Sequence, residues 1–92
     1  MITAFVLVNV DVARIPEAAQ ALAEIEGVRE VHSVTGDWDL VVVVRVKEHE
    51  DLADVIADHL SKTEGVLSTQ TLIAFRAYSK VDLEAAFSLG LD

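Results

Sequence analysis

Two aspartates and the only tryptophan of the chain stand together at a predicted turn, Gly36-Asp37-Trp38-Asp39. Two carboxylates this close could act as a general acid and base, or could bind the ammonium group of a ligand. The structural alternative is that Gly36 and Asp37 form a hairpin turn and that Asp39 accepts a hydrogen bond from a backbone N–H. Trp38 favours a binding site, because a turn has no need of a large apolar ring.

Other residue types with chemical potential show no pattern that indicates catalysis or metal binding. The chain has no cysteine, and its three histidines lack the paired spacing of a zinc site. His59 lies on the apolar stripe of a predicted helix, so we expect a partly buried core residue. Side chains are expected to alternate strictly along a predicted strand over residues 66–77, with Thr69 and Thr71 on one face and Val66 on the other. The two hydroxyls are also what ordinary strand residues supply. We therefore expect no catalytic residue, no metal and no cofactor.

The composition restricts the class of protein. A chain of 92 residues allows one domain, and 52% hydrophobic residues with a single proline indicate a compact globular fold. The formal net charge of −9 argues against direct binding to nucleic acid and against an anionic membrane surface. No apolar stretch approaches the roughly 20 residues of a membrane span, and no signal peptide is visible. We expect a cytoplasmic protein.

Hydrophobic periodicity predicts four strands and two helices. The strands are expected over residues 2–10, 28–35, 40–46 and 66–77, and amphipathic helices over about 16–26 and 50–62. Gly27 and Gly65 follow the two helices and end them. Two strand-helix-strand units with right-handed crossovers predict a ferredoxin-like βαββαβ sandwich of the α+β class over residues 1–80. A short C-terminal helix is expected in the tail, residues 81–92.

The predicted sheet has more apolar surface than two helices can cover. The first strand is apolar on both faces, with Val6 and Val8 on one side and Phe5 and Leu7 on the other. Both helices of this fold lie on the same face of the sheet, so the second face must pack against something else. A dimer that forms between two sheet faces is the natural expectation.

The turn sequence and the order of elements resemble a known family. The likeness is carried by Gly-Val-x-x-Val-His-Ser-Val-Thr-Gly-Asp-Trp-Asp-Leu over residues 27–40, and by Glu-Gly-Val followed by Thr-x-Thr over residues 64–71. These segments are similar to the effector-binding domain of the leucine-responsive regulatory protein (Lrp/AsnC) family, also called the RAM domain, for regulation of amino acid metabolism. The likeness runs from Ile2 to about Lys80.

The resemblance implies a ferredoxin-like fold whose sheets pair face to face, with dimers that assemble into rings such as an octamer or a decamer. It also implies a small effector, often an amino acid, that binds in a cleft between dimers. The N–H groups of a glycine turn suit a carboxylate, and Asp39 suits an ammonium group. The residues that match the ligand-binding positions are Gly36, Asp37, Trp38, Asp39, Thr69 and Thr71.

Regulators of that family carry a helix-turn-helix domain before this one, whereas Met1 here directly precedes the first strand. We therefore expect a stand-alone, non-catalytic effector domain. It would sense an amino acid on its own, or join full-length Lrp/AsnC regulators and modulate them. Two other hypotheses stay open. One is a small cofactor-independent monooxygenase or isomerase of the dimeric α+β barrel type, with His or acidic groups in a cavity between sheet and helices. The other is a structural subunit that binds nothing.

Overall fold

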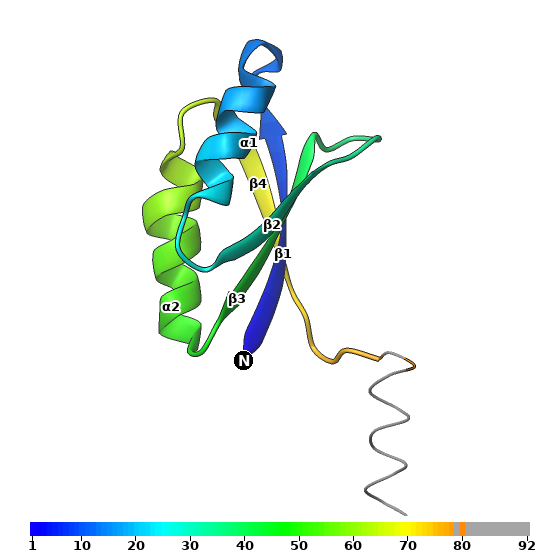
Figure 1. Cartoon of the computed structure of the whole chain (residues 1–92), viewed down its shortest axis with the longest axis vertical. Coiled ribbons are helices and arrows are strands. Elements are labelled where there is room, and N and C mark those ends of the chain that lie inside the picture. Colours follow the sequence, from blue (N-terminus) through cyan, green and yellow to red (C-terminus); the bar gives the residue numbers. More distant parts are fainter. Residues whose placement is uncertain (79, 81–92) are drawn as a thin grey trace, which may run out of the picture.

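Four strands form one antiparallel sheet in the computed structural model, which describes residues 1–78 and Lys80 (Figure 1). They are β1 (Ile2–Val10), β2 (Val28–Ser33), β3 (Leu40–Val46) and β4 (Val66–Ile73), in the spatial order β2-β3-β1-β4. The two strands richest in valine, β1 and β3, take the central positions, where β-branched side chains pack best. The C-terminal helix expected in residues 81–92 lies outside the described residues.

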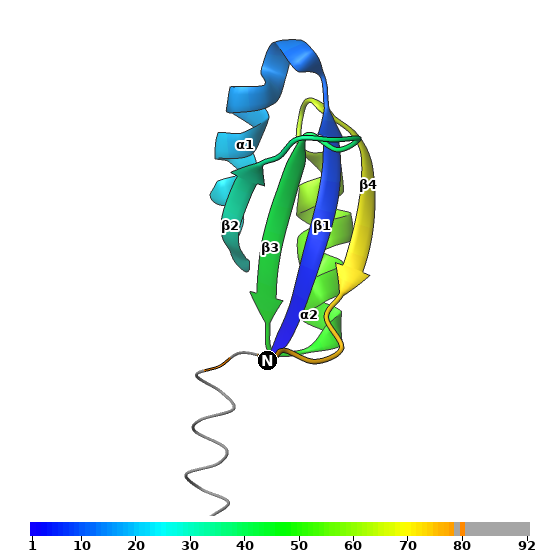
Figure 2. The same ribbon diagram turned by 90° about the vertical axis from the view of Figure 1, so that its right-hand side faces the viewer.

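Two helical segments cover the same face of the sheet (Figure 2). A 3₁₀ turn, η1 (Val12–Arg14), leads into α1 (Ile15–Ala23). The second segment begins as α2 (His49–Ala53), continues as a π-helical stretch, η2 (Asp54–His59), and ends as a 3₁₀ turn, η3 (Leu60–Lys62). The chain therefore has the predicted βαββαβ order, and the expectation of a ferredoxin-like α+β fold is confirmed.

The hydrophobic core lies between the helices and the sheet face that they cover. Alternate residues of β1 and β3 point into it, and Val6 with its partner Val42 is fully buried. Leu22 of α1 and Leu60 of η3 close the core from the helix side and are also fully buried. Burying a side chain of this size stabilises a fold by about 1.5–3 kcal/mol, so these few residues carry much of the stability of a small domain.

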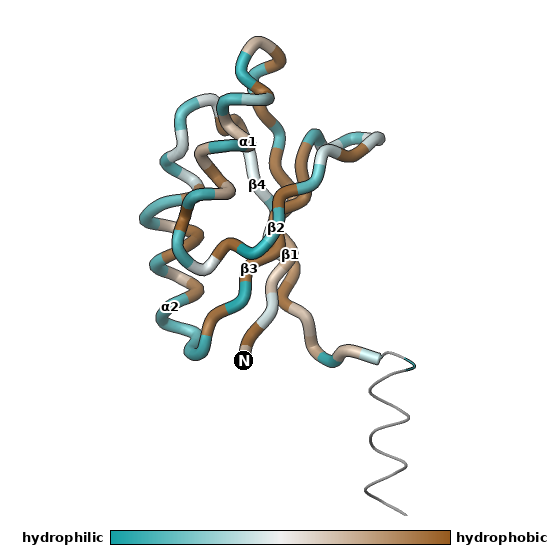
Figure 3. The backbone as a smooth tube through the Cα atoms, viewed as in Figure 1, coloured by the Kyte–Doolittle hydropathy of each residue, from teal (hydrophilic) through white to brown (hydrophobic). Residues whose placement is uncertain are grey.

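The other face of the sheet is apolar and uncovered within the chain. Phe5 of β1 lies opposite Leu72 of β4, and the two residues are 39% and 46% exposed. Leu7 and Val41, which pair between β1 and β3, are half-buried on the same face. Figure 3 shows that hydrophobic residues dominate β1 and β3. This is the surface that the sequence pattern assigns to a partner.

Both outer strands are shorter than predicted. β4 ends at Ile73 and not at residue 77, because its partner β1 begins at Ile2 and the ladder closes with a bond from the N–H of Ala74 to the carbonyl of Thr3, 2.8 Å long. β2 ends at Ser33 and not at residue 35, since the chain turns directly afterwards.

The alternation of side chains along β4 also differs from the prediction. The pairing with β1 shifts register between Asn9 and Val10, so that Val66 lies opposite Val10 while Thr69 lies opposite Val8. Val66 and Thr69 therefore both face the helices, and the strict alternation expected over residues 66–77 is wrong. A β-bulge, which leaves one residue without a partner, is the physical reason.

The π-helical stretch explains a second correction, at His59. A π-helix takes more residues per turn than an α-helix, so Val55 and Leu60, five positions apart, both face the core. His59 is turned outward and is exposed, whereas the helical periodicity of the sequence placed it partly in the core.

Candidate functional site

The predicted turn joins β2 to β3 and is closed at its base by a hydrogen bond. The N–H of Val34 donates to the carbonyl of Asp39 at 3.1 Å. Gly36 has a φ of +108°, which favours glycine, and a Cβ added there would meet no heavy atom within 4 Å. The backbone conformation, and not a lack of space, therefore requires glycine, and the turn is open to solvent on that side.

Asp39 connects this turn to the end of β1. Its N–H donates to the carbonyl of Val8 at 3.0 Å, and its Oδ2 accepts a hydrogen bond from the N–H of Val10 at 2.8 Å, in a partly buried position. These bonds continue the pairing of β3 with β1 beyond Leu40. Asp39 thus has the structural role that the sequence offered as the alternative to ligand binding.

Asp37 and Trp38 differ from Asp39 in what surrounds them. Asp37 is exposed, and among the described residues its carboxylate takes no part in an ion pair. Trp38, the next residue, is half-buried. The turn therefore places an anionic group and an aromatic residue in neighbouring positions.

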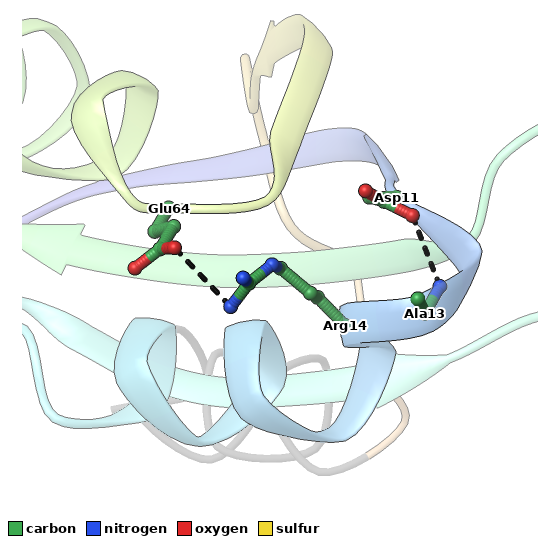
Figure 4. Close-up of polar contacts among 4 residues, drawn as sticks. All are labelled: Asp11, Ala13, Arg14 and Glu64. Atoms are coloured by element: carbon green, nitrogen blue, oxygen red, sulfur yellow. Dashed lines mark hydrogen bonds and ion pairs between the residues drawn. The ribbon is translucent and has the colours of Figure 1, made fainter.

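A second set of polar contacts joins the residues that follow β1 to the loop before β4, and Figure 4 shows the side chains involved. The N–H of Asp11 donates to the carbonyl of Gly65 at 2.8 Å, and the Asp11 side chain caps the 3₁₀ turn that follows it. Arg14 Nη1 lies 3.2 Å from Glu64 Oε1, an exposed ion pair worth at most about 1 kcal/mol. These contacts tie the loop before β4 to the same end of β1 that holds Asp39.

Thr69 and Thr71 lie on the far side of β1 from the turn. They pair with Val8 and Val6 of β1, so both face the helix side of the sheet and both are partly buried. Asp39 binds the opposite edge of the same strand, which separates it from Thr69 by two strand spacings, about 10 Å. Within one chain, the structure therefore gathers residues 36–39 and keeps the two threonines apart from them.

A groove of about 840 Å³ opens at the other end of the sheet, where β2 begins and β3 ends. His59 lines this groove together with charged residues from β2, β3 and the second helical segment. Sequence reasoning missed this groove, because its residues are distant in the chain and follow no motif.

Neither a metal-binding cluster nor a membrane-spanning helix is present in the part of the chain that the structure describes. No group of three or more His, Asp or Glu side chains is placed to hold a metal ion there. None of its helices is long and apolar enough to cross a membrane.

Residues 3–82 match the family model described as the Lrp/AsnC ligand binding domain. The match covers most of the chain and includes the turn and all four strands. The chain belongs to this family, which confirms the resemblance that the turn sequence indicated.

Three similar proteins define the relationship further. PH1916, an HTH-type transcriptional regulator of Pyrococcus horikoshii, is 38% identical over 76 residues, which are 79% of this chain and 51% of that protein. The crystal structure of TTHA0845 from Thermus thermophilus has a TM-score of 0.82 at 49% identity and covers 87% of this chain and 100% of its own. The feast or famine regulatory protein Rv3291c of M. tuberculosis, complexed with L-methionine, has a TM-score of 0.72 at 29% identity over 87% of this chain and 54% of its own.

The chain thus spans about half the length of the transcriptional regulator PH1916 and the whole length of TTHA0845. What this chain shares with the two solved structures is the fold.

Proposed function

We propose that this chain is a non-catalytic, oligomeric module that binds an amino acid or a related small effector. The observation that carries the proposal is the turn at residues 36–39, which combines an open glycine backbone, an exposed aspartate and a half-buried tryptophan. The L-methionine complex of the M. tuberculosis relative supports the ligand class. The residues proposed for this site are Gly36, Asp37 and Trp38, which contact the effector, Asp39, which holds the base of the turn, and Thr69 and Thr71.

The surroundings of each residue suggest which part of the effector it contacts or whether it positions the turn. Asp37 binds the ammonium group of the effector, because its carboxylate is exposed and without an ion pair among the described residues. N–H groups of the turn around Gly36 bind the effector carboxylate, as consecutive backbone amides often do. Trp38 contacts the apolar part of the effector. Asp39 positions the turn through its bond to the N–H of Val10.

The proposed assembly is a dimer through the open sheet faces, with dimers arranged in a ring such as an octamer or a decamer. The exposed pair of Phe5 and Leu72 supports the sheet-to-sheet contact, since burial of apolar area is the main driving force of association. Since Thr69 and Thr71 lie apart from the turn within one chain, any contact of theirs with an effector at the turn would come from a neighbouring subunit.

Two roles follow from binding an effector in this way. The module would sense an amino acid in the cytoplasm on its own, or it would join full-length Lrp/AsnC regulators and change their assembly. The regulators among its relatives support a role in transcription regulation. The net charge of −9 supports an indirect role without contact to nucleic acid.

An enzyme of the dimeric α+β barrel type is the second candidate, and one observation favours it: His59 lines the 840 Å³ groove. His59 is nevertheless exposed, and no carboxylate of the described residues lies within 4 Å of it. A general base needs a partner that orients it and a site that excludes water. The binding module is therefore the better supported function.

A thermal-shift screen of the common amino acids tests the proposal. An effector present at a hundred times its dissociation constant should add roughly 2.7 kcal/mol to the free energy of unfolding, which for a domain of this size raises the melting temperature by roughly 10 to 20 °C. The Asp37→Asn variant should lose most of this shift, while Asp58→Asn, an exposed change on η2, should keep it. No shift with any amino acid would favour a structural subunit that binds nothing.

A further inference from the structure

The chain leaves the sheet after β4 as an extended segment, residues 74–78. The last bond of the ladder runs from the N–H of Ala74 to the carbonyl of Thr3 at 2.8 Å, and residues 75–78 make no further backbone hydrogen bond to the described part of the chain. Figure 1 shows this segment, in orange, running away from the body on the side of the sheet opposite the helices. The strand predicted to reach residue 77 thus continues past the point where its own chain supplies a partner strand.

Two large aromatic side chains of this segment lie outside the core of their own chain. Phe75 is 94% exposed and Tyr78 is 75% exposed, so two of the five aromatic residues contribute nothing to that core. The guanidinium carbon of Arg76 lies 5.9 Å from the centroid of the Phe75 ring and leaves most of the ring uncovered. Aromatic surface exposed on this scale indicates a contact with another molecule, because its burial is strongly favourable.

The open sheet face lies on the same side as this segment and is also apolar. Phe5 and Leu7 of β1 alternate with core-facing residues and therefore point to it, as does Val43, which pairs with Phe5 from β3. Phe5 and its other neighbour, Leu72, are 39% and 46% exposed, and Leu72 precedes the segment by two residues. An exposed apolar pair and an exposed aromatic segment therefore occur at the same end of one face.

The sequence of the segment disfavours a turn back onto the face of its own chain. Residues 74–78 are Ala-Phe-Arg-Ala-Tyr and contain none of the Gly, Pro, Asn or Asp residues that tight turns use. The bond from Ala74 to Thr3 also fixes the direction in which the segment leaves the sheet. A second copy that approaches with its own open face meets the segment without any reversal of the chain.

Charge also favours a second copy as the partner of this segment. The chain has a formal net charge of −9, yet residues 74–78 carry Arg76 and no acidic residue. The open face bears Glu30 of β2, which pairs with Val43 and therefore shares its side of the sheet. A cationic segment laid on an acidic copy reduces the repulsion between two chains of like charge.

We propose that residues 74–78 form an arm that lies on the open sheet face of a second copy of this chain. Phe75 and Tyr78 of the arm cover apolar residues of that face, and by two-fold symmetry each copy gives one arm and receives one. The inference rests on the dimer proposed above and adds to it a segment that is exchanged between the subunits.

The rate of subunit exchange between oligomers that carry two different dyes tests the arm. Phe75→Ser and Tyr78→Ser should each exchange subunits about ten-fold or more faster than wild type, since each removes a buried aromatic ring from the contact. Phe75→Leu keeps an apolar side chain and should exchange more slowly than Phe75→Ser. Val12→Ser, a change at a residue of η1 that is 82% exposed, should exchange as wild type does. Wild-type rates in both aromatic-to-serine variants would overturn the proposal and assign the segment to a different partner.

Photo-crosslinking shows which chain the arm contacts. Because the chain has no cysteine, Phe75→Cys offers a single thiol for a benzophenone label. Illumination should join two chains, seen as a doubled mass on a denaturing gel, with the link in β1, β3 or β4 of the second copy. The same label on Val12→Cys should give no such link.

The outcomes separate the arm from the functions on which it rests. Links that stay within one chain, or a dimer without links, would overturn the arm alone. A wild-type chain that sediments as a monomer would overturn the dimer and the arm together. Neither experiment uses an effector, so a failure of the arm is also distinguishable from a failure of effector binding at residues 36–39.

Discussion

Asp39 is a candidate for ligand binding in the sequence, but in the structure its side chain makes a hydrogen bond that stabilises the fold. Its Oδ2 accepts the N–H of Val10 at 2.8 Å in a partly buried position. Replacing it with Ala leaves that N–H without a partner, so Asp39→Ala should lower the free energy of unfolding by about 1–3 kcal/mol. Urea denaturation measures this. Asp58→Ala, an exposed carboxylate on η2, is the control, and an equal effect of both substitutions would refute the structural role of Asp39.

Gly36 contributes to stability through its backbone conformation and not through a hydrogen bond of a side chain. Its φ of +108° is unfavourable for residues with a side chain, but nothing lies within 4 Å of an added Cβ. Gly36→Ala should therefore cost about 1 kcal/mol of stability through backbone strain alone, and Gly36→Asn, which tolerates positive φ better, should cost less. Thermal denaturation of the two variants gives the comparison, and a larger loss for Asn than for Ala would contradict the explanation.

At the scale of the elements, the contact between β2 and the second helical segment depends on Gly27. An added Cβ would lie 2.8 Å from Val55 Cγ2, and φ is +98° there as well. Gly27→Ala should thus destabilise the chain more than Gly36→Ala does, since a clash adds to the strain. The double variant Gly27→Ala/Val55→Ala should lose less than the sum of the two single variants in urea denaturation. Simple additivity of the two effects would show that the clash is not real.

The elements were largely predictable from the sequence because most of the stability comes from periodic apolar residues. The alternation in β1 and the valine run of β3 indicated the strands, and the helical stripe with Leu22 indicated α1. The β-bulge opposite Asn9 and the π-helical stretch before His59 were missed, because each shifts a pattern by one residue without changing composition. The ends of β2 and β4 depend on where the partner strand ends, which a local pattern does not contain.

The candidate site was predictable only in part for a related reason. The four residues of the turn are consecutive, so their grouping is visible in the sequence. The bond from Asp39 to Val10 joins residues 29 positions apart and needs the register of β1 and β3 to be known. The groove with Arg29 and Arg45 combines separate segments of the chain and leaves no local signal.

For the whole molecule, the open sheet face should determine the oligomeric state. Phe5→Asp places a charge in the proposed dimer contact and should yield a smaller species than the wild-type chain in sedimentation velocity. Val12→Asp is the control, since Val12 is also apolar and 82% exposed but lies in η1, at the end of β1 and away from the sheet face. A wild-type chain that sediments as a monomer would contradict the assembly.

The proposed binding of an effector at residues 36–39 depends above all on Asp37. The most direct measurement is a calorimetric titration of the amino acid that gives the largest thermal shift, with wild type, Asp37→Asn and the control Asp58→Asn. Loss of a charge-assisted hydrogen bond predicts that Asp37→Asn binds about ten-fold or more weakly, while Asp58→Asn binds as wild type does. Equal affinity of all three proteins would show that the effector binds elsewhere.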